Sequence, residues 1–228
     1  VLLKVKDLQA VDDTGVTILN GVDLEIKKGE ILGIAGVSGN GQVCLAEVLT
    51  GIKRAKSGQI IFDGKDLTNG KPIDFINAGI SHVPEDRIGT GTISEFSCVE
   101  NAILKDYRTV KTKSGNIDYN KAEKLCNDFK ERYNIKIAQP KSAVKLLSGG
   151  NMQKLILARE ISSHPKLIIA VHPTYGLDIS AVEMIRRILV EEQKKGVAIL
   201  LISEDLEELL LLSDTISVIY KGRLTPKM

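Results

Sequence analysis

The chain contains the segment Ile31-Leu32-Gly33-Ile34-Ala35-Gly36-Val37-Ser38-Gly39-Asn40-Gly41-Gln42-Val43. An apolar run of this length predicts a buried strand, and the apolar spacing after Gln42 predicts a helix. A glycine-rich loop between a strand and a helix is the setting of a phosphate-binding loop, G-x-x-x-x-G-K-[ST]. Gly36 and Gly41 have that spacing, but Gln42 replaces the lysine and Val43 replaces the Ser/Thr. The glycine loop, residues 36–43, thus keeps its backbone cradle and lacks the side chains that bind terminal phosphates and Mg²⁺.

Composition indicates an ordinary globular protein. The 228 residues are 43% hydrophobic and 26% charged, which allows a substantial buried core. A net charge of +2 argues against nucleic acid or an anionic membrane as a partner. Three widely spaced cysteines without a C-x-x-C pair favour a reducing compartment over a disulfide framework or a zinc site. No apolar run approaches the ~20 residues of a membrane span, and the start at Val1 suggests a fragment.

Hydrophobic periodicity predicts an α/β protein. The first thirty residues predict short strands joined by glycine turns, and residues 97–133 carry mainly helix signals. The fold class that we predict is a P-loop NTPase-type, mostly parallel sheet core with an N-terminal antiparallel β region and an inserted helical subdomain. The predicted elements are strands 31–35, 80–83, 167–171, 197–202 and 216–220, a hairpin at 58–65, helices 42–49, 72–78, 180–195 and 205–212, and helices capped by Ser97, Asp118 and Ser148.

Three local features carry specific expectations. Asp63-Gly64 predicts a hairpin turn, and Gly51 is a candidate C-cap for the helix that follows the glycine loop. The four leucines 209–212 lie between acidic residues, and we expect them to form one buried helix face.

Four further motifs follow the glycine loop in a fixed order. They are Val83-Pro84-Glu85-Asp86-Arg87, Leu147-Ser148-Gly149-Gly150-Asn151, a strand that runs through Val171-His172-Pro173-Thr174 to Gly176-Leu177-Asp178, and Ser203-Glu204-Asp205. In this order they resemble the nucleotide-binding domain of ABC transporters over essentially the whole chain. The L-S-G-G motif ahead of P-T-x-G-L-D is the most specific feature of this resemblance.

The resemblance is sharper to one branch of the family. The glycine loop with Gln42, Pro84-Glu85-Asp86-Arg87 and Ser148-Gly149-Gly150-Asn151 resemble the second, C-terminal half of tandem subunits that serve bacterial simple-sugar and nucleoside importers. This implies one ABC domain over residues 1–228, with an α/β core at about 1–87 and 148–228 and a helical subdomain at about 88–147. It also implies a longer tandem parent protein.

In the family, the glycine loop and the residue at position 85 bind nucleotide, here ATP or ADP. Val43 and Val171 stand where Mg²⁺ contacts are expected, so Mg²⁺ binding by this site is doubtful, and we assign no metal ligand. His172 and Glu204 occupy the positions of the catalytic glutamate and the switch histidine, so we assign no catalytic residue. An aromatic residue that stacks on adenine is absent between Leu8 and Leu24, so Ile18 or a residue from elsewhere would pack there. The predicted nucleotide-binding residues are Gly36, Val37, Ser38, Gly39, Asn40, Gly41, Gln42, Val43 and Glu85.

The second motif, residues 147–151, is called the signature segment here. In ABC dimers each ATP lies between the glycine loop of one domain and the signature segment of the other, and a helix N-terminus favours such an anion. Two consecutive glycines at a helix start have no evident packing reason, which favours a functional role. The residues expected to complete a partner's ATP site are Leu147, Ser148, Gly149, Gly150, Asn151 and Asp178.

The resemblance implies the ATP-binding part of an importer for nucleosides or simple sugars, with little or no hydrolysis by this domain alone. Its expected partners are another nucleotide-binding domain, in the N-terminal half of the same polypeptide, and membrane permease subunits docking at 90–100. The expected location is cytoplasmic, at the inner face of the membrane, without direct insertion. One alternative is a nucleotide-independent scaffold that kept the fold. Another is a soluble ABC ATPase of repair or translation, which the near-neutral charge and the lack of a coiled-coil insertion disfavour.

Overall fold

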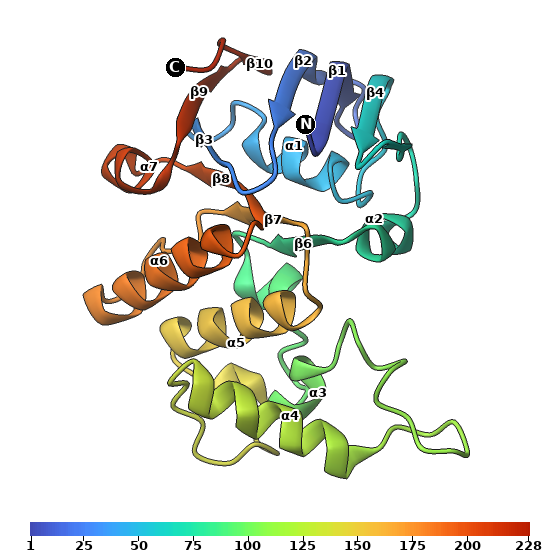
Figure 1. The fold of residues 1–228 in the computed structure, drawn as a ribbon, viewed down its shortest axis with the longest axis vertical. Helices are drawn as coiled ribbons and strands as arrows, with labels where there is room; N and C mark the ends of the chain where they lie inside the picture. The colour runs from blue at the N-terminus through green and yellow to red at the C-terminus, as the bar shows by residue number, and fades with distance from the viewer. The chain divides into compact units, whose positions relative to one another are not determined.

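The computed structural model describes residues 1–228, and the chain forms two compact units (Figure 1). The first unit contains both termini and comprises Val1–His82, Pro165–His172 and Arg186–Met228. The second unit comprises Val83–His164 and Pro173–Ile185. The helical unit thus extends beyond the predicted segment 88–147.

An antiparallel sheet forms the N-terminal part of the first unit. Its strands pair in the order β2-β1-β4-β5. Asp63 and Gly64 join β4 to β5 with φ angles of 47° and 80°, which confirms the predicted hairpin turn. The strands are β1 (Leu3–Val11), β2 (Thr17–Ile26), β4 (Ser57–Phe62) and β5 (Lys65–Asp66).

The second sheet is mostly parallel, as predicted, and has the order β10-β9-β3-β8-β7-β6. β3 runs parallel to both β8 and β9, and β7 runs parallel to β8. Every residue of β7 and β8 is buried, which explains their unbroken apolar sequences. The strands are β3 (Ile31–Ala35), β6 (Ile80–Val83), β7 (Leu167–Val171), β8 (Ala198–Ser203), β9 (Thr215–Tyr220) and β10 (Arg223–Leu224).

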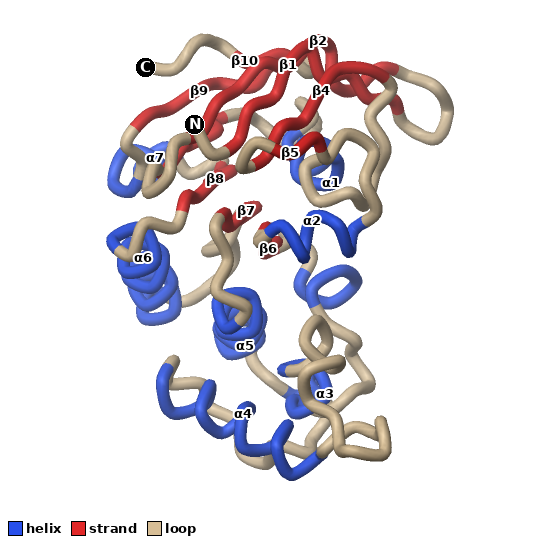
Figure 2. Tube along the Cα trace, turned by 45° about the vertical axis from the view of Figure 1, so that its right-hand side comes forward, coloured by secondary structure: helices blue, strands red, loops and turns tan.

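Helices α1 (Gln42–Val48), α2 (Pro72–Ala78) and α7 (Leu206–Leu212) belong to the first unit. Buried side chains of both sheets and of α1 form one hydrophobic cluster. Figure 2 shows the backbone path of these strands and helices. Gly79 ends α2 in the left-handed conformation, which favours glycine at a helix C-terminus. The expected role of Gly51 was wrong, because the C-cap of α1 is Leu49. A Cβ at Gly51 would lie 2.7 Å from the ring of Phe75, so this glycine permits close packing.

The second unit is helical. Ser97, Asp118 and Ser148 cap its helices as predicted. Helix α5 packs against both α3 and α4, and these contacts explain why α5 groups with the helical unit. None of the chain's helices is long and apolar enough to cross a membrane. The helical segments are the π-helix Arg87–Gly91, α3 (Cys98–Ala102), α4 (Tyr119–Arg132), the 3-10 turn Val144–Leu146, α5 (Gly149–Ser162) and α6 (Ile179–Lys194), which continues into the first unit.

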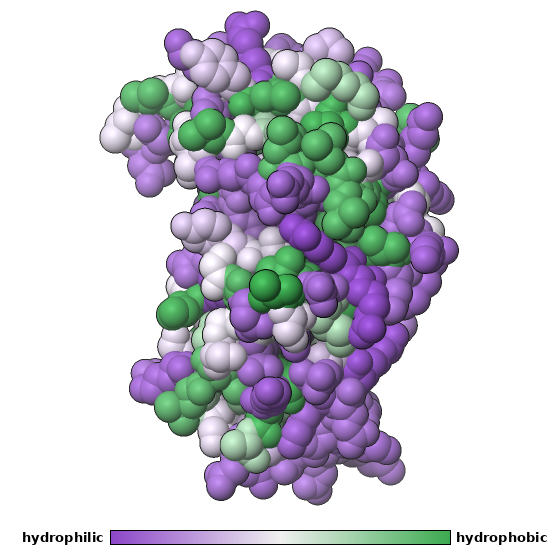
Figure 3. Space-filling model, turned by 90° about the vertical axis from the view of Figure 1, so that its left-hand side faces the viewer, coloured by the Kyte–Doolittle hydropathy of each residue, from purple (hydrophilic) through white to green (hydrophobic).

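The leucine run of α7 does not form one buried face. Leu209 is fully buried, whereas Leu210 and Leu211 are 67% and 68% exposed. Successive residues turn by about 100° around a helix, so four consecutive side chains cannot all face the sheet. Hydrophobic side chains therefore reach the surface on the side of the molecule that carries α7 (Figure 3).

Candidate functional site

The glycine loop connects β3 to α1, as predicted. Gly41 precedes α1 with a φ of 107°, a left-handed conformation that favours glycine. A Cβ at Gly36 would lie 2.8 Å from the carbonyl oxygen of Ile219, so the loop also needs a glycine where it leaves β3. The first amides of α1 have no side-chain cap. These backbone features provide the shape of a phosphate-binding loop.

Gln42 is only 2% exposed, and its side chain folds back on the loop. Its Nε2 donates to the carbonyl of Val37 at 2.8 Å, and its Oε1 accepts from the amide of Asn40 at 3.0 Å. The carboxamide therefore bonds to the loop's own backbone in this structure. A neutral donor thus stands at the lysine position, and it already donates a hydrogen bond to the carbonyl of Val37.

Asn40 connects the glycine loop to the β9–β10 turn. Its Oδ1 accepts from the amide of Lys221 at 2.9 Å, and its carbonyl accepts from the amide of Gly222 at 3.0 Å. Its Nδ2 also donates to Val37 at 2.8 Å. This role was not predictable from local sequence, because Lys221 lies 181 positions away. Together, the side chains of Asn40 and Gln42 hold the loop in shape.

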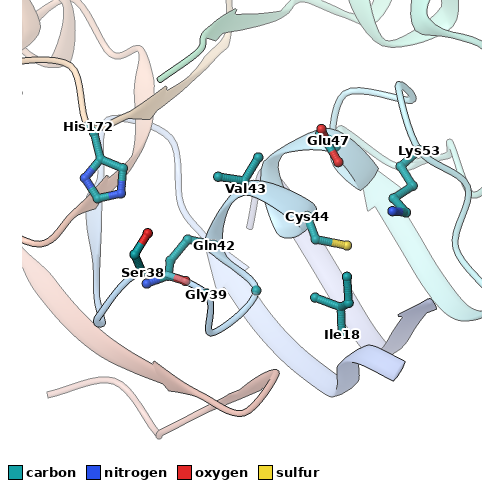
Figure 4. Close-up of a pocket in the computed structure, with 10 residues that line it drawn as sticks. Ile18, Ser38, Gly39, Gln42, Val43, Cys44, Glu47, Lys53 and His172 are labelled. Atoms are coloured by element: carbon teal, nitrogen blue, oxygen red, sulfur yellow. The ribbon is translucent and has the colours of Figure 1, made fainter. Parts of the chain in front are cut away.

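The loop borders a pocket of about 260 Å³. Figure 4 shows Ser38, Gln42 and His172 at one end of the pocket and Lys53 at the other. Ile18 also lines it. The lining residues are Ile18, Ser38, Gly39, Gly41, Gln42, Val43, Cys44, Glu47, Lys53 and His172.

The residues at the two expected Mg²⁺ positions do not fit this ion. Val43 lines the pocket, and Val171 ends β7 with 1% exposure. Both side chains are hydrocarbon, whereas Mg²⁺ requires oxygen ligands. The described residues contain no cluster of three or more His, Cys, Asp or Glu that could hold a metal.

His172 and Glu204 differ in their relation to the pocket. His172 is 6% exposed, lines the pocket and has a φ of 45°. Its amide donates to the carbonyl of Ile202 at 2.8 Å. Glu204 is exposed after β8 and does not line the pocket. The structure therefore brings only His172 of this pair to the glycine loop.

Cys44 gives a direct test of the burial of this pocket. Burial raises the pKa of its thiol to about 11, against a smaller lowering by Lys53. Because the thiolate is the reactive form, we expect iodoacetamide at pH 8 to alkylate Cys44 at least tenfold more slowly than free cysteine. Mass spectrometry of the tryptic peptide would measure this rate. Labelling of Cys44 at the rate of free cysteine would contradict the buried position.

The signature segment lies in the second unit and opens α5. Ser148 caps the helix and is exposed, and so is Gly149. The Ser148 hydroxyl accepts from Nδ2 of Asn151 at 2.8 Å. The Oδ1 of Asn151 accepts from the amide of Lys136 at 2.8 Å. Asn151 thus holds the cap in place, and Ser148 and Gly149 are open to solvent, whereas Gly150 and Met152 are buried.

Asp178 lies beside the signature segment in the same unit. Its Oδ1 accepts from the amide of Ala181 at 3.0 Å. A Cβ added at Gly150 would lie 2.9 Å from the Cβ of Ala181 and 3.5 Å from Oδ2 of Asp178. The expectation that both signature glycines lack a packing reason was therefore wrong for Gly150. A Cβ at Gly149 would meet only ordinary contacts.

Two residues of the second unit complete this description. Glu85 is exposed two residues after the end of β6. Arg87 is half-buried, and its Nε donates to Oε1 of Gln153 at 3.0 Å. The motif at residues 83–87 predicted no separate role for Arg87.

The fold and the glycine loop define a nucleotide-binding domain of the P-loop type. The chain belongs to the ABC transporter family, because the family model described as "ABC transporter" matches residues 19–175.

Curated relatives carry the names of import ATP-binding proteins. The chain is 42% identical over 224 residues to a glucose import ATP-binding protein of Haloferax volcanii, covering 97% of this chain and 41% of that protein. It is 39% identical over 225 residues to a nucleoside import ATP-binding protein of Lactococcus lactis, covering 98% and 44%. The chain therefore spans less than half the length of these relatives.

A nucleotide-free ATP-binding cassette from an ABC transporter superposes with a TM-score of 0.83 at 22% identity, covering 99% of this chain and 90% of that chain. A dimeric cassette bound to ADP and Pi superposes with a TM-score of 0.82 at 20% identity, covering 100% and 98%. These likenesses confirm the predicted ABC ATPase fold.

Proposed function

We propose that this chain is an ATP-binding domain of an importer for nucleosides or simple sugars, and that it is the C-terminal half of a tandem subunit. The names and lengths of the relatives support this proposal, since each is more than twice the length that the chain covers. A second nucleotide-binding domain in the same polypeptide and a membrane permease are the partners. The domain then works at the cytoplasmic face of the membrane.

The domain's own site holds nucleotide and hydrolyses it slowly or not at all. A charged hydrogen bond contributes about 1.5–3 kcal/mol, whereas a neutral one contributes about 1 kcal/mol. Gln42 can offer only the neutral kind, and its carboxamide already bonds to Val37 and Asn40. Phosphoryl transfer depends mainly on electrostatic stabilisation by cations, and Val43 and Val171 bind none. Loss of a positioned general base alone lowers a rate by about 10²–10⁴.

The signature segment completes the ATP site of the partner domain, and that site is the one that hydrolyses ATP. Ser148 and the amides at the start of α5 present hydrogen-bond donors and the positive end of a helix dipole to an anion. Ser148 and Gly149 are exposed, so a partner domain can bring its ATP against them. Asp178 lies next to this surface. The observation that carries the proposal is this contrast between a glycine loop without cation-handling groups and an open signature segment.

The permease contact is assigned to residues 90–100. Ile93 and Phe96 are each 43% exposed there. Exposed apolar side chains on an ordered loop are suited to docking against another protein.

Titration of this chain with ATP in a calorimeter tests the proposal. We expect saturable binding with dissociation constants that agree within threefold with and without Mg²⁺, because no side chain ligates the ion. Ile18→Asp, which places a carboxylate in the pocket, should weaken binding at least tenfold. Leu211→Asp is the matched control on an exposed leucine outside the pocket.

Two results would contradict this assignment. Binding that tightens more than tenfold with Mg²⁺ would show that the ion is held. No heat of binding at millimolar ATP would instead favour the nucleotide-independent scaffold.

A further inference from the structure

Arg87 joins two segments that are far apart in sequence. Its Nε donates to Oε1 of Gln153 in α5, and its Nη2 donates to the carbonyl oxygen of Tyr175. Both partners are neutral, and Gln153 is 1% exposed. The N–H donors of a planar guanidinium have a fixed arrangement. The two hydrogen bonds of Arg87 therefore fix the position of the Tyr175 carbonyl relative to Gln153 in α5.

The loop that carries Arg87 is itself held firmly. The Asp86 side chain accepts from the amides of Ile88 and Gly89 at 3.0 and 2.9 Å. The hydroxyl of Thr92 donates to the carbonyl of Arg87 at 2.8 Å. A Cβ at Gly91 would lie 2.7 Å from Cδ1 of Ile156 in α5, so the loop lies directly on that helix. Arg87 therefore extends from a rigid base.

The turn between β7 and Asp178 contains Tyr175, with Thr174 buried before it and Asp178 bonded to the amide of Ala181 after it. Tyr175 is 70% exposed, so its side chain does not fix the turn. The amide of Leu177 donates to Thr174 at 3.3 Å, and Asp178 follows at the start of α6. The Arg87 bond to Tyr175 thus restrains the turn between β7 and Asp178.

We propose that Arg87 is a positioning residue for the ATP site that this domain completes on its partner. It fastens the turn that carries Asp178 to helix α5, so that Ser148 and Asp178 meet the partner's ATP at a fixed spacing. This inference rests on the proposed function. A misplacement of a catalytic group by about 1 Å can lower a rate by about 10²-fold. Loss of the Arg87 hydrogen bonds should therefore lower the rate of ATP hydrolysis measurably.

Partial burial lowers the pKa of the Arg87 guanidinium, which still remains a cation at neutral pH. The positioning role of Arg87 depends on hydrogen bonds to two acceptors in different directions as well as on its charge. Lysine keeps the charge but has a compact ammonium group, so it cannot span Gln153 and Tyr175 in the same geometry.

The test compares Arg87→Met and Arg87→Lys in the full-length subunit assembled with its permease. We expect Arg87→Met to lower kcat for ATP hydrolysis 10- to 100-fold, with KM for ATP within threefold of wild type. Arg87→Lys should recover less than a third of the lost rate. Hydrogen exchange of the amides at 175–178 should be at least fivefold faster in Arg87→Met. The matched control is Arg186→Met, because Arg186 is also half-buried and pairs with Asp205 and Glu208 away from this cluster.

A kcat within twofold of wild type in Arg87→Met would overturn the positioning role, and so would unchanged exchange at 175–178. Full rescue by lysine would show that charge alone matters and would overturn the requirement for the two hydrogen bonds. The proposed function fails by a different result, namely unchanged hydrolysis when the signature segment itself is blocked at Ser148.

Discussion

Replacement of Ser148 by arginine is expected to lower ATP hydrolysis by the assembled full-length transporter at least a hundredfold. Ser148 is the exposed cap of α5, and its hydroxyl bonds to the side chain of Asn151. Arginine cannot cap the helix as serine does, and its long side chain fills the space where a partner's triphosphate must approach. Interactions made only in the closed, reacting state affect kcat directly. A coupled ATPase assay on reconstituted transporter measures this loss.

The control for this substitution is Ser114→Arg, which adds the same side chain to an exposed loop of the same unit. We expect that variant to hydrolyse ATP within twofold of wild type. Nucleotide binding by this chain alone should be equal in Ser148→Arg and wild type, because Ser148 does not line the pocket at the glycine loop. Retention of more than a tenth of the wild-type rate in Ser148→Arg would contradict the assignment of the signature segment.

Features set by neighbouring residues were predictable from the sequence. Ser97, Asp118 and Ser148 cap helices through bonds to amides three positions ahead, and this chemistry depends only on local order. The positive φ angles at Asp63 and Gly64 follow from the residue types of the turn. The mostly parallel sheet followed from apolar runs that alternate with helical periodicity.

Features that depend on distant segments were not predictable. Asn40 bonds to Lys221, and Arg87 bonds to Gln153 and Tyr175, over large separations in sequence. No local pattern marks such partners. The absence of the lysine was evident from the sequence, but the hydrogen bonds of the Gln42 side chain to the loop backbone were not predictable from it.

The second prediction with a large expected effect concerns Asn101, which is fully buried in α3. Its Oδ1 accepts from the amide of Ile93 at 2.9 Å, and its Nδ2 donates to the carbonyls of Ile93 and Phe96 at 3.1 and 3.2 Å. Each buried polar group left without a partner costs about 1–3 kcal/mol. We expect Asn101→Ala to lower the free energy of unfolding by about 2–4 kcal/mol, measured by urea denaturation.

Asn116→Ala is the matched control, because Asn116 is exposed in a loop of the same unit. Exposed substitutions of this kind change stability by about 0.5 kcal/mol or less. Asn101→Asp should be at least as damaging as Asn101→Ala, since it keeps the acceptor and buries a charge without donors for the carbonyls of Ile93, Phe96 and Ser97. A loss below about 1 kcal/mol in Asn101→Ala would show that water replaces these bonds.

The same substitution connects stability to the proposed permease contact. Asn101 holds the turn that presents Ile93 and Phe96 at the surface, so its loss should loosen the docking loop before the unit unfolds. We expect Asn101→Ala subunits, assayed at a temperature where they are folded, to co-purify with the permease at less than a third of the wild-type yield. Ile93→Ser leaves the Asn101 bonds to the backbone intact, and a similar loss in that variant would assign the effect to the apolar contact itself. Wild-type yields in both variants would place the permease contact outside residues 90–100.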